Sequence, residues 1–331
     1  MKLGIHDLAV WTDLYTHEEV MANVVDLAKS AEKWGYHRYW MSEHHGDKQY
    51  TSSAPEVITS YLAGQTDSIR VGTGGIMMMH YSPLKVAEVV NTINTLAPGR
   101  MDFGVGRAPG SNMDTAQVLS RGQTIDPHLL YDHIDMTLDY IKGERPDHEL
   151  YGKTEASPQP EILPEAYLLG SSGDSARVAG EQGIGYSFAQ FFMNGAMQKS
   201  IFDTYKEAFK PSEFADKSNI IVSYNVTVGE TEEEAEYQAK PADIMKILQA
   251  SGQRAPIMSP EEAKDIPISD QVAKAIEINR DTHIVGTPKQ VAERLMKDKE
   301  DYGFDEIMIA NFSHSHEQRK YTYEALAKEL L

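Results

Sequence analysis

The stretch Arg38-Tyr-Trp-Met-Ser-Glu-His-His45 places a cluster of polar residues directly after a short apolar run. Its first four residues predict a strand, and the Glu-His-His triplet follows where the strand gives way to a loop. Two later strands end in a comparable way, in Val71-Gly-Thr-Gly-Gly75 and in Gly104-Val-Gly-Arg-Ala-Pro-Gly110. Barrels of parallel strands carry their chemistry at such carboxyl ends. The repeated pattern therefore predicts a barrel with its functional site on one face.

Strand and helix patterns alternate along the whole chain. Eight segments have the pattern of strands, and segments with helical periodicity separate them, which favours a parallel sheet. Eight such units favour closure into a barrel over an open, doubly wound sheet. The fold prediction is therefore α/β, a (β/α)8 TIM barrel with insertions that forms a single domain over residues 1–331. The predicted strands are residues 3–5, 38–41, 69–73, 101–106, 166–169, 186–189, 220–228 and 306–310.

Three capping boxes mark predicted helix starts. In this motif, a Ser or Thr side chain and a Glu or Gln three residues later both bind backbone N–H groups of the first turn. The three boxes are Thr16-His-Glu-Glu19, Ser53-Ala-Pro-Glu56 and Thr287-Pro-Lys-Gln290. We also expect a helix over residues 128–141, and the acidic residues 230–236 predict the first turn of another helix.

One segment in the second half lacks the regular alternation. Residues 252–271 are rich in proline and charge and show no clear periodicity, in a place where only a short connection is needed. Long insertions without structure are usually lids or mobile loops. We therefore expect a mobile insertion around residues 250–280.

The composition is that of a chain that can bury a full hydrophobic core. Hydrophobic residues make up 41% of the 331 residues, and the formal net charge is -19. This charge repels nucleic acid and anionic membrane surfaces, so neither is expected as a partner. The absence of cysteine excludes disulfides, thiolate nucleophiles and zinc–cysteine sites. No signal pattern opens the chain, and no apolar run approaches the roughly 20 residues that span a bilayer. We expect a cytoplasmic protein.

Five motifs in the same order resemble those of the bacterial luciferase-like flavin monooxygenases, and the likeness covers essentially the whole chain. The resemblance implies a (β/α)8 barrel that binds FMN at the carboxyl ends of its strands, usually as a homodimer. One departure is Gly106, because luciferases have a reactive cysteine at this position; light emission is accordingly not predicted. The motifs are Glu43-His44-His45, Val71-Gly-Thr-Gly-Gly75, Ser82-Pro-Leu-Lys-Val-Ala-Glu88, Pro98-Gly-Arg-Met-Asp-Phe-Gly-Val-Gly-Arg107 and Leu168-Leu-Gly-Ser-Ser172.

The residues that follow the fifth predicted strand have the features of a phosphate-binding helix start. A flavin phosphate is a dianion, and barrels receive phosphate on backbone N–H groups at a helix N-terminus near their later strands. Ser171, Ser172 and Ser175 offer hydroxyl groups next to Gly170, and Arg107 could add a bidentate charge from the neighbouring strand end. Ordinary helix capping is the alternative interpretation of the serines. We expect these five residues to bind the phosphate of the cofactor.

Two further features concern the flavin ring and the chemistry. Gly74 and Gly75 indicate a backbone that approaches a flat ligand closely, and a flexible turn is the alternative. The resemblance implies a non-proline cis peptide against the flavin ring here. By similarity to luciferase, His44 is the candidate base, because a histidine at a strand end can titrate near neutrality, and Glu43 and His45 support it. Adjacent side chains on an extended segment point in opposite directions, so a purely structural His45 is the alternative.

The resemblance also implies a reaction and its partners. Reduced FMN, supplied by a separate flavin reductase, binds first. Oxygen then adds at the C4a carbon, and the resulting C4a-peroxyflavin oxidises a small organic substrate while a lid excludes water. The expected partners are therefore O2, the small organic substrate and the reductase.

Three alternatives stay open. A deazaflavin-dependent oxidoreductase of the same fold would have a similar phosphate site. A metal-dependent barrel hydrolase could assemble His314 and His316 with Glu43, His44 and His45, although the sequence favours no metal site. A non-catalytic flavoprotein would keep the fold and the phosphate site without turnover.

Overall fold

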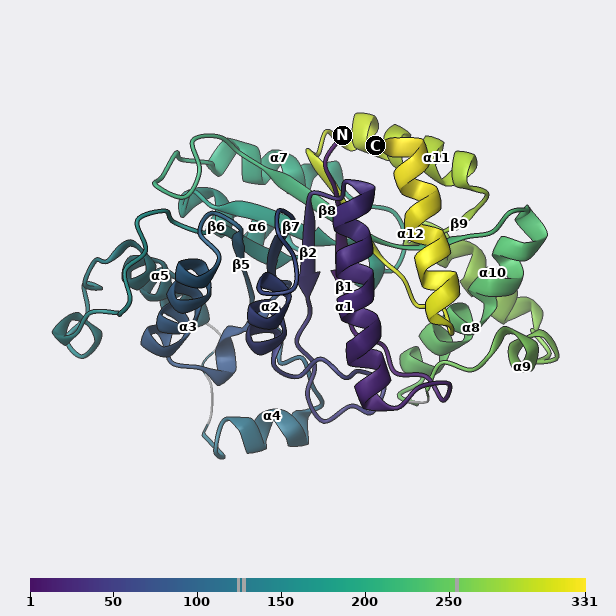
Figure 1. Cartoon of the computed structure of the whole chain (residues 1–331), viewed down its shortest axis with the longest axis horizontal. Helices are drawn as coiled ribbons and strands as arrows, with labels where there is room; N and C mark the ends of the chain where they lie inside the picture. Colours follow the sequence, from purple (N-terminus) through teal and green to yellow (C-terminus); the bar gives the residue numbers. More distant parts are fainter. Residues whose placement is uncertain (124–125, 127–128, 254–255) are drawn as a thin grey trace.

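The computed structural model describes residues 1–331 except 124–125, 127–128 and 254–255. Eight parallel strands form a closed barrel that helices surround (Figure 1). The ring closes because β10 pairs with both β1 and β8. The predicted (β/α)8 barrel is confirmed, and its strands are those predicted from the sequence. They are β1 (Leu3–Asp7), β2 (Arg38–Met41), β3 (Arg70–Thr73), β5 (Met101–Gly106), β6 (Glu165–Gly170), β7 (Gly185–Ala189), β8 (Ile220–Val228) and β10 (Glu306–Ala310).

Two strands were not predicted. β4 (Ile76–Met77) pairs with the end of β5, and β9 (His283–Gly286) pairs with the second half of β8. β8 is nine residues long, so its beginning lies in the barrel between β7 and β10 while its end extends past the rim. A strand of two residues and one of four are too short to show alternation in the sequence.

Helices cover the outside of the barrel. The first and last helices lie side by side, and both chain termini lie at one end of the barrel (Figure 1). The helix that follows β5 lies apart from this layer, at the opposite end (Figure 1). The helices are α1 (His17–Trp34), α2 (Pro55–Ala63), α3 (Pro83–Leu96), α4 (Met113–Leu119), α5 (Leu129–Lys142), α6 (Gly173–Glu181), α7 (Lys199–Ala208), α8 (Glu232–Ala250), α9 (Pro260–Lys264), α10 (Asp270–Asn279), α11 (Pro288–Tyr302) and α12 (His316–Leu330).

Two of the three predicted capping boxes form. The side chains of Thr16 and Thr287 each accept a hydrogen bond from the backbone N–H of the residue three positions later, and the side-chain oxygen of that residue accepts one from the threonine backbone N–H. The box predicted at Ser53 is wrong, because the residue that precedes α2 is Ala54 and no side chain caps this helix. Pro55 explains the difference. Proline favours the first helical position and keeps the residue before it out of the helix, so α2 begins too late for Ser53 to cap it.

The segment predicted to lack structure contains two short helices, which corrects the prediction. α9 has a capping box between Ser259 and Glu262, and Ser269 caps α10. α9 spans only five residues, so it carries no visible period in the sequence. Residues 254–255 lie outside the described residues. The mobility of this insertion and the single-domain boundary of 1–331 stay predictions.

Other segments follow the sequence more closely. The helix predicted over residues 128–141 is α5, and position 128 lies outside the described residues. The acidic stretch does form the first turn of a helix, because Thr231 caps α8 and three glutamates follow it. α4 and α7 were not predicted. In the described part of the chain, no helix is long and apolar enough to cross a membrane. The cytoplasmic location stays a prediction.

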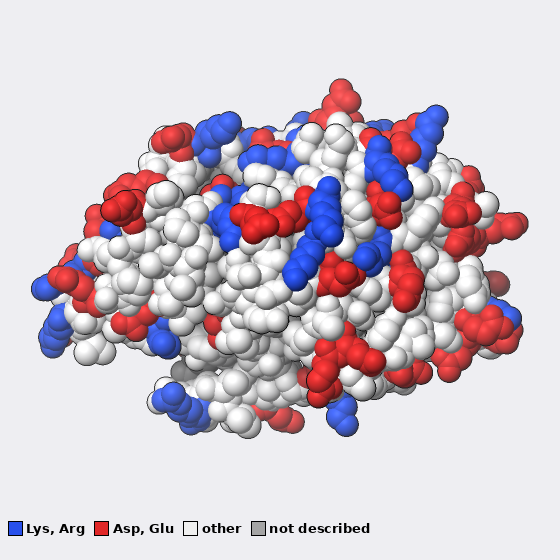
Figure 2. Space-filling model, in the orientation of Figure 1, with Lys and Arg blue, Asp and Glu red and all other residues white. Residues whose placement is uncertain are grey.

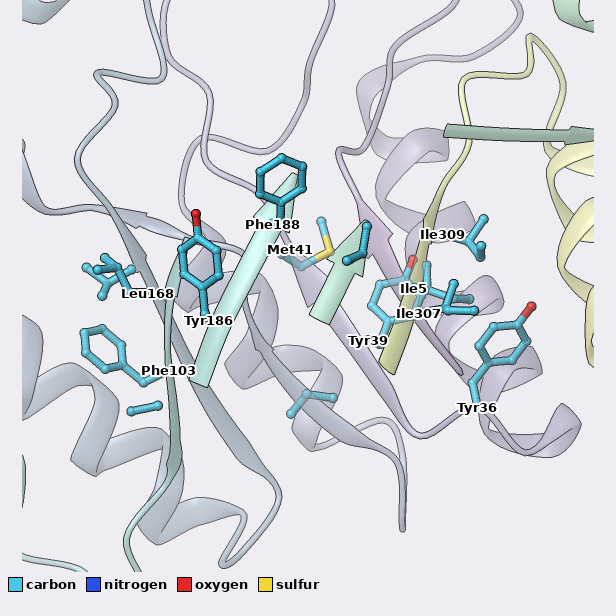
Figure 3. Close-up of a cluster of buried hydrophobic side chains, with 14 of the residues drawn as sticks. Ile5, Tyr36, Tyr39, Met41, Phe103, Leu168, Tyr186, Phe188, Ile307 and Ile309 are labelled. Atoms are coloured by element: carbon cyan, nitrogen blue, oxygen red, sulfur yellow. The ribbon is translucent and has the colours of Figure 1, made fainter. Parts of the chain in front are cut away.

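The main hydrophobic core fills the space between the barrel and its helices. Side chains alternate along a barrel strand, so Tyr39 and Met41 of β2 belong to this outer core. Trp40 lies between them and belongs to a separate cluster inside the barrel. The side chains labelled in Figure 3 are members of the outer core: Ile5, Tyr36, Tyr39, Met41, Phe103, Leu168, Tyr186, Phe188, Ile307 and Ile309.

A buried ion cluster fills the amino end of the barrel. Arg38 of β2 is fully buried and pairs with Asp102 of β5 and with Glu306 of β10, the latter at 3.0 Å. Asp102 also pairs with Arg70 of β3. These residues stand at the beginnings of their strands, so the cluster lies at the opposite end from the predicted site. Glu165 of β6 also pairs with Arg38, at 3.1 Å, so the cluster connects five barrel strands.

Candidate active site

The carboxylate of Glu43 ties the end of β2 to the segment that follows β3. It is fully buried and accepts hydrogen bonds from three donors. Oε1 accepts from the Tyr81 hydroxyl at 2.7 Å and from His45 Nε2 at 2.6 Å, and Oε2 accepts from the backbone N–H of Met77 at 2.9 Å. Burial, helped by the Glu43 charge, raises the pKa of Tyr81, so its hydroxyl keeps its proton and donates. Glu43 thus holds its neighbours in place and is itself enclosed by protein.

His45 belongs to the same network. Its ring nitrogen faces Glu43, and its backbone N–H donates to the Gly110 carbonyl at 2.8 Å. The ring also meets His80 edge to face, and His80 Nε2 donates to the Pro109 carbonyl at 2.8 Å. The network therefore joins the ends of β2 and β5. This geometry favours the structural interpretation of His45, with a carboxylate as its partner.

His44 turns to the other side of the chain, toward a cavity. Its ring stacks on Tyr50 with the ring centres 4.1 Å apart, and Nδ1 lies 3.2 Å from the Ser42 hydroxyl. The cavity has a volume of about 680 Å3, and Gly110 and Phe192 also line it. The two adjacent histidines thus point in opposite directions, as the extended backbone predicts.

The peptide bond between Gly74 and Gly75 is cis, which confirms the expectation from the resemblance. The requirement for glycine comes from the protein itself. A methyl group at Gly75 would lie 2.9 Å from the carbonyl carbon of Gly104 in β5, and one at Gly74 would lie 2.9 Å from His6 Nε2. Both contacts are too close for any larger residue. This segment therefore packs tightly on β1 and β5.

His6 of β1 contacts the candidate site at Gly74, and the sequence interpretation missed it. Burial lowers its pKa to about 4, against the opposing effects of its hydrogen bond to Gly74 and the charge of Asp7. The neutral ring donates from Nε2 to the Gly74 carbonyl, so Nδ1 accepts from the Ser223 hydroxyl at 3.3 Å. His6 stands one residue past the predicted strand 3–5. The signal that could have found it is a polar residue at a strand end, as at His44.

Arg107, directly after β5, lies near the start of α6. The carbon at the centre of its guanidinium is 4.1 Å from the ring centre of Tyr131 in α5. The buried hydroxyl of Tyr131 has no hydrogen-bond partner among the described residues. Hydrogen bonding from Arg177 lowers the pKa of Asp174 in the first turn of α6, and the charge of Arg107 adds to this effect. The Tyr131 hydroxyl is buried beside Asp174, so Arg107 and the backbone N–H groups of the helix start are the groups that fit an oxyanion such as a phosphate.

The serines at the start of α6 divide into two groups. Ser172 caps the helix, and the Ser175 hydroxyl donates back to its carbonyl at 2.9 Å. Ser175 is buried against Gly170, where a methyl group would overlap its hydroxyl. Ser171 is exposed. The capping interpretation therefore holds for Ser172 and Ser175, and Ser171 is the serine that a ligand reaches most easily.

Three cavities adjoin along the carboxyl ends of the strands. The first, about 420 Å3, contains Ser171 and Ser172. The second, about 480 Å3, lies beside β8, α8 and α10 and shares Asn194 with the first. The third is the cavity of His44, which shares Phe192 with the second. The predicted phosphate-binding serines and His44 therefore lie at opposite ends of one row of cavities.

The histidines of the metal alternative do not come together. His314 Nε2 lies 2.7 Å from Asp13, and His316 Nε2 lies 2.9 Å from Asp26, whereas His45 pairs with Glu43. Among the described residues, no group of three or more His, Cys, Asp and Glu side chains could hold a metal ion. The ligand set that a metal-dependent hydrolase needs is not formed by these residues.

A parallel barrel with polar strand ends beside adjoining cavities defines a (β/α)8 enzyme with its site on the carboxyl face. Sequence comparison gives the family. A model described as luciferase-like monooxygenase matches residues 1–306, and the chain belongs to this family. It is accordingly an oxidoreductase.

Similar proteins cover the whole length of the chain. The protein YwcH of Bacillus subtilis (strain 168) is 36% identical over 98% of this chain and 98% of its own length. The N-acetyl-S-alkylcysteine monooxygenase of the same strain is 30% identical over 100% of this chain and 98% of its own length. The crystal structure of apo-MsnO8 has a TM-score of 0.91 at 29% identity and covers 100% of this chain and 99% of that chain.

Proposed function

We propose that the protein is a flavin-dependent monooxygenase that uses reduced FMN and O2 to oxidise a small organic substrate. The observation that carries this proposal is the row of cavities that joins a cationic helix start to His44, in a chain of the luciferase-like monooxygenase family. Bound reduced FMN would supply the electrons that activate O2. The residues of the chain would bind and orient FMN and the substrate, and they would exclude water from the site.

The phosphate of FMN would bind at the start of α6. Arg107 would contribute a positive charge, and Ser171 and Ser172 would contribute their hydroxyl and backbone groups. Gly170 and Ser175 pack against each other and give the turn its shape. The ring of Tyr131, which the sequence interpretation did not include, would hold the Arg107 guanidinium in place by its cation–π contact. The ring would then extend along the strand ends toward Gly74 and Gly75.

His44 would hold or transfer a proton at the reacting atom. Its ring lines the cavity, so it is the side chain that would exchange a proton with a substrate bound there. Stacking on Tyr50 orients the ring. Glu43 and His45 would act as positioning residues, since their polar atoms are engaged with each other and with the segment after β3.

A deazaflavin is the second candidate cofactor. An F420-dependent secondary alcohol dehydrogenase has the same fold, with a TM-score of 0.72 at 15% identity. The proposed phosphate site at Arg107 and the start of α6 would suit the phosphate of either cofactor. A non-catalytic flavoprotein would bind FMN without altering its reaction with O2.

Electrons would come from a separate flavin reductase. The chain has no Gly-x-Gly-x-x-Gly fingerprint of a nicotinamide-binding unit, and Gly104, Gly106 and Gly110 have the wrong spacing for it. A reductase would therefore deliver reduced FMN to the barrel.

The proposed homodimer would form through the outer faces of α2 and α3. Val57 and Tyr61 of α2 are 63% and 59% exposed, and they line a hollow of about 820 Å3 together with Val89 of α3. Figure 2 shows a largely uncharged area over these helices. Exposed apolar surface of this kind is typical of protein interfaces. Analytical ultracentrifugation should find a dimer that Tyr61→Glu dissociates, and a monomeric wild-type protein would contradict the proposal.

Titration of the protein with FMN, oxidised and then anaerobically reduced, tests the function. We expect tighter binding of the reduced form, and we expect Arg107→Ala to weaken binding about 10- to 100-fold through loss of a charged hydrogen bond. Arg145→Ala is the matched control, because Arg145 is an exposed arginine paired with Glu155 far from the site. Binding of a deazaflavin in place of FMN would favour the second candidate. Absence of binding by either cofactor would contradict both.

A further inference from the structure

The cavity between β8, α8 and α10 carries an inference about the substrate, which rests on the function proposed above. We propose that this cavity binds the substrate, and that the substrate is an apolar molecule with a carboxylate and a neighbouring secondary amide, as in an N-acylated amino acid. Lys246 would bind the carboxylate, and Asn225 would bind the amide. Both residues line the cavity.

Asn225 lines this cavity, and its side-chain oxygen is turned into the surrounding protein. Its side chain is 8% exposed, and its Oδ1 is buried without a hydrogen-bond partner among the described residues. The residue stands where β8 leaves the barrel, opposite Ala310 of β10 on one side and His283 of β9 on the other. A buried amide oxygen without a donor is unfavourable, so a rotation of the Asn225 side chain that lets this oxygen accept from a ligand N–H in the cavity would be favoured.

Lys246 of α8 supplies a positive charge beside this amide. Its ammonium group donates to the Met193 carbonyl at 2.9 Å and to the Thr282 hydroxyl at 2.6 Å, and a third N–H remains for a ligand. Thr282 brings the two residues together, because its carbonyl accepts the backbone N–H of Asn225 at 3.2 Å. Burial lowers the pKa of Lys246 to about 8, against the opposing charge of Asp243, so the group is a cation at neutral pH.

The nearby carboxylate does not neutralise Lys246. Asp243 accepts two hydrogen bonds from Arg280, at 2.7 and 2.9 Å, and His283 Nδ1 lies 2.9 Å from the same carboxylate. Asp243 is therefore already paired with a guanidinium. A ligand carboxylate is the group that suits the remaining positive charge of Lys246, because a half-buried ammonium favours an anionic partner over a neutral one.

The rest of the cavity suits an apolar body. Its volume of about 480 Å3 lies in the range of small-molecule sites. The cavity also shares Tyr50, Phe192 and Gln249 with the cavity of His44. A substrate held by its polar end at Lys246 would therefore extend its apolar end toward His44. The apolar side chains of the lining include Phe191, Phe192, Met245, Ile278 and Phe312.

Calorimetric titration with N-acetyl-S-benzyl-L-cysteine and with its methyl ester, each with and without FMN, tests the inference. We expect the acid to bind and the ester to bind roughly 10- to 100-fold more weakly. Lys246→Met should weaken binding of the acid by a similar factor, and Lys246→Arg should restore most of it. Asn225→Ala should weaken the acid and the ester about equally, roughly tenfold. Lys289→Met, at an exposed lysine of α11, is the matched control.

The comparison of acid with ester uses the unaltered protein, so it does not depend on the folding of any variant. Equal affinity for the acid and the ester, or no binding of the acid, would overturn the inference. FMN binding in the same preparation reports separately on the proposed function. Flavin binding without probe binding overturns the inference alone, whereas Lys246-dependent probe binding without flavin supports the site and contradicts the proposed cofactor.

Discussion

At the scale of single residues, three neighbours in the sequence have three different environments. Glu43 is enclosed by donors, His45 faces Glu43, and His44 faces a cavity. The sequence could locate this triplet at a strand end, and alternation could separate the two histidines. It could not show that Glu43 is buried, because its partners Met77 and Tyr81 come from a segment more than 30 residues away.

Replacement of Glu43 by glutamine should destabilise the fold. The amide removes the charge and presents an N–H group where three donors converge, so we expect a loss of about 2 kcal/mol in the free energy of unfolding. Urea denaturation followed by circular dichroism measures it. Glu144→Gln, at an exposed glutamate just after α5, should change stability little. A Glu43→Gln variant as stable as the wild type would show that the hydrogen-bond network around Glu43 contributes nothing to the stability of the fold.

His6 should make stability depend on pH. Its folded pKa of about 4 lies below its ordinary value of 6.5, so the unfolded chain binds the proton more readily. The free energy of unfolding should therefore be unaffected by His6 above pH 6.5 and should fall by about 3 kcal/mol between pH 6.5 and 4. In urea titrations across this range, His6→Gln should lose this part of the pH dependence. Parallel curves for the variant and the wild type would contradict the assignment.

At the scale of elements, two capping motifs that look alike in the sequence should respond differently to mutation. Thr287→Ala removes a side-chain cap from α11 and should cost about 1 kcal/mol of unfolding free energy. Ser53→Ala should cost almost nothing, because Ser53 caps no helix. Thermal denaturation of both variants measures the contrast. Equal losses at the two positions would mean that Ser53 does cap α2 in solution.

The sequence predicts long elements well and short ones poorly. All eight barrel strands were found, since each is an apolar run bounded by turn residues. β4 and α9 were missed because they have two and five residues, too few for a period. β9 is ordered by pairing with β8, a contact that its own sequence does not reveal.

At the scale of the whole molecule, the two ends of the barrel differ in structure and in proposed role. The amino end contains the buried ion pairs around Arg38, and the carboxyl end carries the row of cavities that includes the cavity of His44. Arg38→Met should leave two buried carboxylates, Asp102 and Glu306, with only Arg70 and Lys2 respectively as cationic partners, and should lower the free energy of unfolding by about 3 kcal/mol. The urea midpoint of this variant, compared with that of Arg145→Met, measures the loss. A change below about 1 kcal/mol would show that the cluster does not hold the barrel together.

The sequence could predict residues of the candidate site only where they follow predicted strands. Gly74, Arg107 and the serines of α6 follow predicted strands, so the barrel rule identifies them. Lys246 and Asn225 could not be found in this way. The sequence predicted the first turn of α8 but not its length, so it did not place Lys246 in this helix. Asn225 lies in a predicted strand, but only the structure shows that this strand extends past the barrel rim. Cavities formed by several distant elements require the tertiary structure.

The most direct test of the central claim is the time course of oxidation of reduced FMN by O2, followed by flavin absorbance in a stopped-flow instrument with protein in excess. The account predicts a time course different from that of free reduced FMN, altered by His44→Asn and unchanged by His148→Asn at an exposed position. A time course identical to that of free flavin would contradict the claim that this barrel encloses reduced FMN for reaction with oxygen.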